Sequence, residues 1–122
     1  MTAPGNICAF LLLMVSTFSA LAGYDIHVTR KPFWADESGP RITFEQWQAY
    51  VLTDPQVVKD SANGPEDFMV LISEESFPIW YRSDLGEVYT KDPSEQAIRK
   101  LEEIARALGA SVQGDDGESY PR

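Results

Sequence analysis

Three short runs rich in β-branched and aromatic residues constrain the fold more than any other feature of the sequence. The runs FMVLIS, PIWYRS and EVYTKD occupy residues 68–73, 78–83 and 87–92, and the connecting segments EESF and DLG are very short. A parallel pair of strands needs a crossover of a dozen or more residues, whereas an antiparallel pair needs only a short turn. The spacing therefore predicts three strands that form an antiparallel meander.

Further elements are predicted before this meander. Residues 24–30, YDIHVTR, alternate apolar and polar side chains, which indicates a strand with one buried face. Thr43 and Gln46 have the spacing of a capping box, so a helix is predicted to begin there and to end near Thr53. Residues 54–60, DPQVVKD, are predicted to form a single short helical turn, because Pro suits the first turn of a helix.

The strongest helix signal follows the meander. Asp92 is predicted as the N-cap, with Pro93 in the first helical position. Gly109 is predicted to end this helix, and residues 110–113 are predicted to form a short final strand. The apolar residues of the helix recur at helical spacing and form one stripe: Ile98, Leu101, Ala105 and Leu108.

The predicted order of elements is β-α-(short α)-β-β-β-α-β. It indicates an α+β fold, a two-layer sandwich in which two main helices cover one face of a mostly antiparallel sheet. The chain has 122 residues, of which 43% are hydrophobic, so one folded domain is expected and disorder throughout is not. This single domain should span residues 23–122 and include an acidic C-terminal tail.

Charge limits the classes of partner. The formal net charge is −9, and the first 23 residues contain no Asp, Glu, Lys or Arg. A domain with this negative charge repels the phosphate backbone of nucleic acid, which is therefore an unsuitable partner. The charge favours a basic protein or a cation instead. Cys8 is the only cysteine of the sequence, so neither an internal disulfide nor a Cys-rich zinc site is expected, and the sequence indicates no cofactor.

The N-terminal segment has the pattern of a secretory signal. Residues 7–23 contain an apolar block followed by small residues, and an A-x-A pattern predicts cleavage between Ala22 and Gly23. The segment lacks a basic residue before this block, so two alternatives stay open. The first alternative is a non-native extension before a true start near Tyr24. The second is an uncleaved membrane anchor, but a helix that crosses a membrane needs about 20 apolar residues, so this segment is barely long enough. If the leader is functional, we expect an exported protein, periplasmic or secreted, that has no stable membrane anchor after cleavage. If it is not functional, we expect a cytoplasmic protein.

Several segments carry a resemblance. YDIHVTR, ITFEQW and LGASVQGDDGESY resemble a group of short uncharacterised bacterial proteins that start directly before the YDI-type strand and end in a GDDGE-Y tail. The similarity covers most of residues 24–120, and the tail is its most specific part. The resemblance implies a bacterial single-domain protein and no particular activity. This sequence departs from the group by carrying the leader.

The tail GDDGE is the first candidate for a functional site. Asp115, Asp116 and Glu118 could serve as weak ligands of Mg²⁺ or Ca²⁺, but they lack the alternating spacing of a calcium loop. Glycine and aspartate are also typical of a solvated turn. The third interpretation is that these carboxylates dock a basic partner.

His27 is the only histidine, and it should lie on the polar face of a strand with Asp25 and Thr29. Residues two apart on a strand point alike but stand about 7 Å apart, beyond hydrogen-bond reach. We therefore interpret His27 as an ordinary strand histidine. Because GxSxG, HExxH and P-loop motifs are also absent from the sequence, we expect a protein that is not an enzyme.

Four aromatic residues are predicted to form a contact surface. In PIWYRS, alternation places Tyr81 on one face of the strand and Trp80 on the other, with Tyr89 near Trp80 on the adjoining strand. Phe33 and Trp34 lie in a long predicted loop. Such residues are enriched at protein interfaces. The alternative is that sheet twist or the long loop covers Trp80.

The sequence thus favours a small acidic binding module without catalysis, such as an immunity-like or inhibitor protein that recognises a basic partner. The candidate contact residues are the four aromatics and the acids of the tail: Phe33, Trp34, Trp80, Tyr89, Asp115, Asp116 and Glu118. One alternative is a weak divalent-cation-dependent or carboxylate-based enzyme that uses the three tail acids. Another is an envelope accessory protein of structural role, which requires a functional leader.

Overall fold

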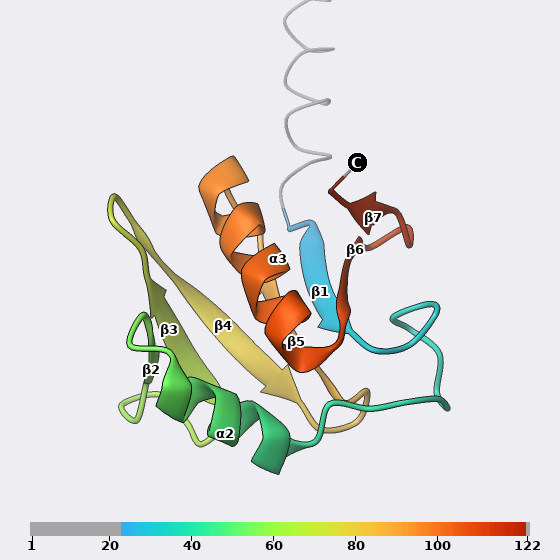
Figure 1. Cartoon of the computed structure of the whole chain (residues 1–122), viewed down its shortest axis with the longest axis horizontal. Coiled ribbons are helices and arrows are strands. Elements are labelled where there is room, and N and C mark those ends of the chain that lie inside the picture. Colours follow the sequence, from blue (N-terminus) through green and yellow to red (C-terminus); the bar gives the residue numbers. More distant parts are fainter. Residues whose placement is uncertain (1–22, 122) are drawn as a thin grey trace, which may run out of the picture.

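A computed structural model describes residues 23–121 of the chain (Figure 1). The predicted signal segment, including Ala22 of the predicted cleavage site, lies outside the described residues. Within residues 23–121, no helix has the length and the apolar character that crossing a membrane requires.

The described residues form one seven-stranded sheet and two helices, and every strand pair is antiparallel. The strand order is β2-β3-β4-β5-β1-β6-β7. The α+β class and the β3-β4-β5 meander are therefore as predicted. The elements are β1 (Asp25–Thr29), α2 (Phe44–Thr53), β2 (Val57–Lys59), β3 (Asp67–Leu71), β4 (Ser76–Arg82), β5 (Glu87–Lys91), α3 (Glu95–Leu108), β6 (Ser111–Gly114) and β7 (Ser119–Tyr120).

The helical turn predicted over residues 54–60 is wrong. This segment contains β2, whose Val57 lies opposite Val70 of β3 and is 2% exposed. Two consecutive valines favour extended backbone because their branched side chains lose rotamer freedom in a helix. The segment therefore adds an edge strand to the meander.

The helix α2 begins as its sequence predicts. Thr43 is the N-cap, and its hydroxyl accepts a 3.1 Å hydrogen bond from the backbone N–H of Gln46, whose side chain accepts from the backbone N–H of Thr43 at 3.0 Å. Trp47 is fully buried and meets the ring of Phe68 edge-on, with 5.5 Å between centroids. The capping box thus fixes the start of a helix that presents its indole to the sheet.

The predicted cap of α3 is wrong by two residues. Ser94, not Asp92, is the N-cap, and its hydroxyl accepts a hydrogen bond from the backbone N–H of Ala97. Asp92 has a positive φ of 47°, and its two carboxylate oxygens accept from the backbone N–H groups of Gly23 and Tyr24. Its side chain therefore holds the start of β1 rather than the start of the helix.

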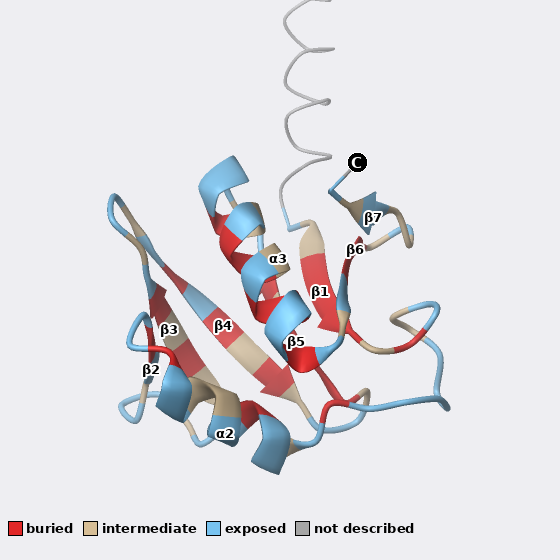
Figure 2. Ribbon diagram, in the orientation of Figure 1, coloured by how far each residue is buried: buried red, intermediate tan, exposed pale blue. Residues whose placement is uncertain are grey.

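The remainder of α3 follows the predicted pattern with one exception. Gly109 adopts the left-handed conformation, at φ 62°, and ends the helix as predicted. Leu101, Ala105 and Leu108 are buried, whereas Ile98 is only half-buried. Figure 2 shows the buried residues of α3 along the side that faces the sheet.

The sheet has two faces of different character. Tyr81, Val88 and Val28 lie opposite one another on β4, β5 and β1, and all three are buried in the hydrophobic core together with Trp47 of α2 and Leu101 of α3. We call this the core face.

Side chains alternate along a strand, so Trp80, Tyr89, His27 and Gln113, on β4, β5, β1 and β6, point to the opposite face. We call this the aromatic face. The long segment between β1 and α2 contacts it through Trp34.

Candidate functional site

His27 lies at the centre of the aromatic face. The register of the sheet places it opposite Tyr89 of β5 on one side and opposite Gln113 of β6 on the other. Although it was predicted on a polar strand face, His27 is 0% exposed. The interpretation as an ordinary strand histidine therefore misses its burial and its partners.

Two carboxylates hold the imidazole of His27. Its Nδ1 lies 2.6 Å from Oε2 of Glu87, and its Nε2 lies 2.8 Å from Oδ1 of Asp115. We call these residues the Glu87–His27–Asp115 triad. Burial alone would lower the pKa of His27, but the hydrogen bonds to Glu87 and Asp115 outweigh it and raise this pKa. The triad therefore favours an imidazolium that donates to both carboxylates.

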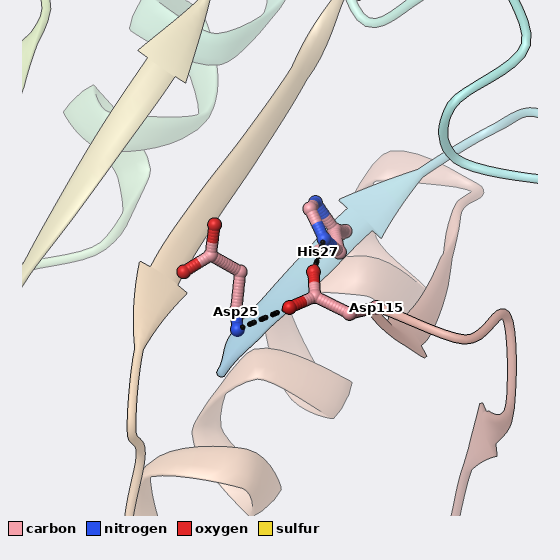
Figure 3. Close-up of side chains that lie close together, drawn as sticks. All are labelled: Asp25, His27 and Asp115. Atoms are coloured by element: carbon pink, nitrogen blue, oxygen red, sulfur yellow. Dashed lines mark hydrogen bonds and ion pairs between the residues drawn. The ribbon is translucent and has the colours of Figure 1, made fainter. Parts of the chain in front are cut away.

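Asp115 reaches His27 because it directly follows β6, whose last residue, Gly114, lies opposite Ile26 of β1. The other oxygen of its carboxylate, Oδ2, accepts a 3.0 Å hydrogen bond from the backbone N–H of Asp25 (Figure 3). The turn is closed by a 2.9 Å bond from Gly117 N–H to the carbonyl of Gly114, and Gly117 has a φ of 84° that favours glycine. One aspartate thus fastens the tail to the strand at two points.

Trp34 covers His27 from the solvent side. The two rings are stacked, with 3.7 Å between centroids and 9° between planes. The indole Nε1–H of Trp34 donates to the backbone carbonyl of Asp115 at 3.1 Å, and its backbone N–H donates to Oε1 of Gln113 at 2.9 Å. The long loop is therefore fixed to the same residues that hold the tail.

Rings continue on both sides of this stack. From Trp80 the centroid distances are 5.2 Å to Tyr89, then 6.4 Å from Tyr89 to His27, 3.7 Å from His27 to Trp34 and 5.8 Å from Trp34 to Phe33. We call these five residues the aromatic strip. Phe33 is 40% exposed, while Trp34, Trp80 and Tyr89 are half-buried. The structure thus brings together all four aromatic residues that were predicted to form a contact surface.

The three tail acids do not share one centre. Asp115 binds His27, whereas the Glu118 carboxylate accepts from the hydroxyl of Tyr24 and, at 3.4 Å, from that of Tyr120. Burial and the bond to Glu118 raise the pKa of Tyr24 to about 12. Asp116 is exposed. Of the three tail acids, Asp115 and Glu118 are therefore engaged in internal hydrogen bonds, and Asp116 faces solvent.

One set of potential metal ligands stands out in residues 23–121. Asp25, His27 and Asp115 each place one ligand atom within 4.8 Å of the others, and neither Asp116 nor Glu118 belongs to this group. The carboxylate of Asp25 also forms a 3.1 Å ion pair with Lys91. The group lies where β1 meets the tail (Figure 3).

Glu87 is the functional residue that sequence reasoning missed. It is 0% exposed, and its Oε1 has no hydrogen-bond partner among the described residues. The available signal was a charged residue at the start of β5, because alternation places it on the same face as Tyr89. Its pairing with His27 follows only from the order of the strands.

The chain matches no protein-family model, no curated protein and no solved structure.

Proposed function

We propose that the chain is a small, acidic, non-catalytic binding module that recognises a basic protein through the aromatic strip. The observation that carries this proposal is the continuity of the strip, which extends from Trp80 across β5 and β1 to the exposed ring of Phe33. Aromatic side chains are enriched at the centres of protein interfaces, where they bury a large area.

Charge supports a basic partner. The net charge of −9 attracts a positively charged protein over long range and raises the rate of encounter. Close to the strip the charges are mixed: the Arg82 guanidinium lies 5.3 Å from the ring centroid of Tyr89, and Asp84 is well exposed beside it. The strip therefore provides the short-range contact, and the overall charge provides the attraction.

The triad favours binding over catalysis. A general base must reach the proton that it removes, but His27 is buried beneath Trp34 and both of its ring nitrogens are engaged. No observation in the described residues favours an enzyme that uses Asp115, Asp116 and Glu118 together. An inhibitor or an immunity-like protein would act by masking a basic partner, which requires complementary charge and no active site.

Capture from an extract of the source cells tests the proposal with matched variants. Phe33→Ser and Trp80→Ser remove two parts of the strip, and Leu52→Ser is the control, because Leu52 is 90% exposed on α2 and outside the strip. We expect the native chain and Leu52→Ser to retain the same basic protein, and the strip variants to lose it.

The captured protein, once purified, allows the contact to be measured directly. We expect each strip variant to weaken its binding by about tenfold or more, as is typical of an aromatic hot spot, and high salt to slow association. An acidic captured protein, or equal affinity for all four chains, would contradict the proposal.

The place of action depends on the leader. We propose export, with cleavage between Ala22 and Gly23, and the mass of the N-terminus in native material tests it. A chain that starts at Gly23 or Tyr24 outside the cytoplasm supports export. A chain that starts near Tyr24 and has no precursor would make the protein cytoplasmic, and the envelope role would then be excluded.

A further inference from the structure

A metal site is the strongest inference that the aromatic face allows beyond partner binding. We propose that Nε2 of His27 and the carboxylates of Asp25 and Asp115 bind one divalent transition-metal ion, best matched by Zn²⁺. The ion would take the place of the proton between His27 and Asp115. The site shares His27 with the aromatic strip, but this ring is buried beneath Trp34. The metal site and the partner contact are therefore tested independently, and either could exist without the other.

The donor set favours a transition metal. One imidazole nitrogen and two carboxylates suit Zn²⁺ or Mn²⁺, whereas Ca²⁺ and Mg²⁺ prefer sites made of oxygen atoms alone. Three protein ligands also leave a fourth position for water in tetrahedral zinc geometry. Because the side chain of Asp115 is 33% exposed and that of Asp25 is 18% exposed, solvent reaches this side of the group.

Glu87 is the second, independent observation that supports the site. Its carboxylate is fully buried and lies 2.6 Å from Nδ1 of His27, on the side of the ring away from Asp115. A histidine that binds a metal through one nitrogen usually donates its other N–H to such a carboxylate, which fixes the tautomer and the ring orientation. Glu87 thus leaves the Nε2 lone pair of a neutral His27 directed at Asp115.

The charges are better balanced by a dication than by a proton. Glu87, Asp25 and Asp115 bring three carboxylates near one imidazole, and Lys91 offsets only one of them. If Asp25 gives up Lys91 to bind the ion, Lys91 drops out of the count. A proton on His27 then leaves two negative charges on the group, whereas a divalent ion on neutral His27 leaves one.

Small movements complete the coordination. Zinc bonds of about 2.0 to 2.2 Å place ligand atoms roughly 3.3 Å apart around the ion, and the atoms of this group lie within 4.8 Å of one another. Nε2 of His27 and Oδ1 of Asp115 lie 2.8 Å apart, so they must separate slightly to admit the ion. Figure 3 shows the carboxylate of Asp25 turned away from that of Asp115, so Asp25 must rotate and exchange Lys91 for the ion.

Calorimetry and thermal unfolding of the full chain with Zn²⁺, Mn²⁺, Mg²⁺ and Ca²⁺ test the site. We expect one Zn²⁺ per chain, weaker binding of Mn²⁺, and no heat with Mg²⁺ or Ca²⁺. Asp115→Asn should abolish zinc binding, while Asp116→Asn is the control, because Asp116 adjoins Asp115 and lies outside the group. Absence of zinc binding by the native chain, or equal affinity of native chain and Asp115→Asn, would overturn the proposal.

Two further variants keep the test decisive if Asp115→Asn disturbs the fold. Lys91→Gln releases Asp25 and removes a neighbouring positive charge from an exposed side chain, so zinc affinity should rise about threefold or more. Glu87→Gln keeps all three ligands but weakens the support of His27, so affinity should fall about 10- to 100-fold. If Lys91→Gln weakens zinc binding, or if Glu87→Gln leaves it unchanged, the ion lies elsewhere and the proposed site is wrong.

Discussion

The two faces of the sheet are held by different kinds of interaction. On the core face, Val28, Val88 and Tyr81 are buried against apolar side chains of both helices, and many small contacts share the stabilisation. On the aromatic face, a few hydrogen bonds centred on His27 join the loop, the sheet and the tail. The comparison teaches that the core face sets how stable the domain is, whereas the aromatic face sets where Trp34 and Asp115 lie.

The largest effect is expected on the core face. Trp47→Ala removes a fully buried indole between α2 and β3, so the free energy of unfolding should fall by about 3–5 kcal/mol. Chemical denaturation followed by circular dichroism measures the change. A loss below about 1 kcal/mol would mean that the core face can collapse around the cavity, and the contrast between the faces would weaken.

On the aromatic face, one substitution should cost almost as much for an electrostatic reason. His27→Leu leaves the buried carboxylate of Glu87 without a cation, which should lower the free energy of unfolding by about 3 kcal/mol. The double variant His27→Leu/Glu87→Leu removes both charges and should recover most of this loss, because an apolar pair avoids the desolvation penalty.

The same denaturation experiment compares the single and the double variant. If the double variant is no more stable than His27→Leu, the stabilisation by His27 comes from packing, and the two faces are alike. If the double variant recovers most of the lost stability, the ion pair between His27 and Glu87 adds little to the stability of the fold, and its main effect is to fix the positions of these side chains.

A smaller loss of stability is expected when the cover of His27 is removed. Trp34→Ala deletes the stacked ring and its hydrogen bond to the carbonyl of Asp115, and we expect a loss of about 1–2 kcal/mol. Amide hydrogen exchange should rise in the loop and in the GDDGE turn, with β3 and β4 unaffected. Faster exchange throughout the sheet would instead indicate that the loop supports the whole fold.

The core face has a charged contact of its own, which predicts a pH dependence. Lys100 of α3 lies 2.8 Å from Asp54 at the end of α2. Burial alone would raise the pKa of Asp54, but hydrogen bonds from Lys100 and Tyr50 outweigh it and lower this pKa below its ordinary value. Asp54 therefore stabilises the fold above about pH 4, and this contribution is lost as the pH falls through the lowered pKa.

Unfolding measured between pH 7 and pH 3 checks this dependence. The native chain should lose stability in acid more steeply than Asp54→Asn, which has no carboxylate to protonate at this position. If the free energy of unfolding falls equally with pH in the two chains, Asp54 is not responsible for the loss of stability in acid. Lys100→Met is a second comparison, because without the ammonium the carboxylate of Asp54 loses its main stabilising partner.

Local patterns predicted much of the fold, because short spacers and caps act over a few residues. The meander and the capping box at Thr43 depend on such near neighbours, and both are present. The strand β2 was missed because a short apolar segment such as Val57–Lys59 fits a helical turn as well as a strand. The cap of α3 was misplaced because Asp92 is occupied by a distant partner, the start of β1.

The candidate site depended on information that a local pattern does not contain. The prediction that His27 does not bond Asp25 or Thr29 through side chains agrees with its observed partners. Those partners, Glu87 and Asp115, stand 60 and 88 positions further along the chain. Only the placement of β1 between β5 and β6 brings them together, and strand order follows from global packing.

The central position of β1 also affects how the protein is made. β1 is the first strand of the sheet to leave the ribosome, yet its neighbours β5 and β6 are made much later, and β6 ends at Gly114. Contacts between such distant segments slow folding, because a long loop must close before they form. In the nascent chain, one edge of β1 therefore stays unpaired until β5 has been made, and the other edge stays unpaired until β6 has been made. During this interval a chaperone can bind the exposed strand.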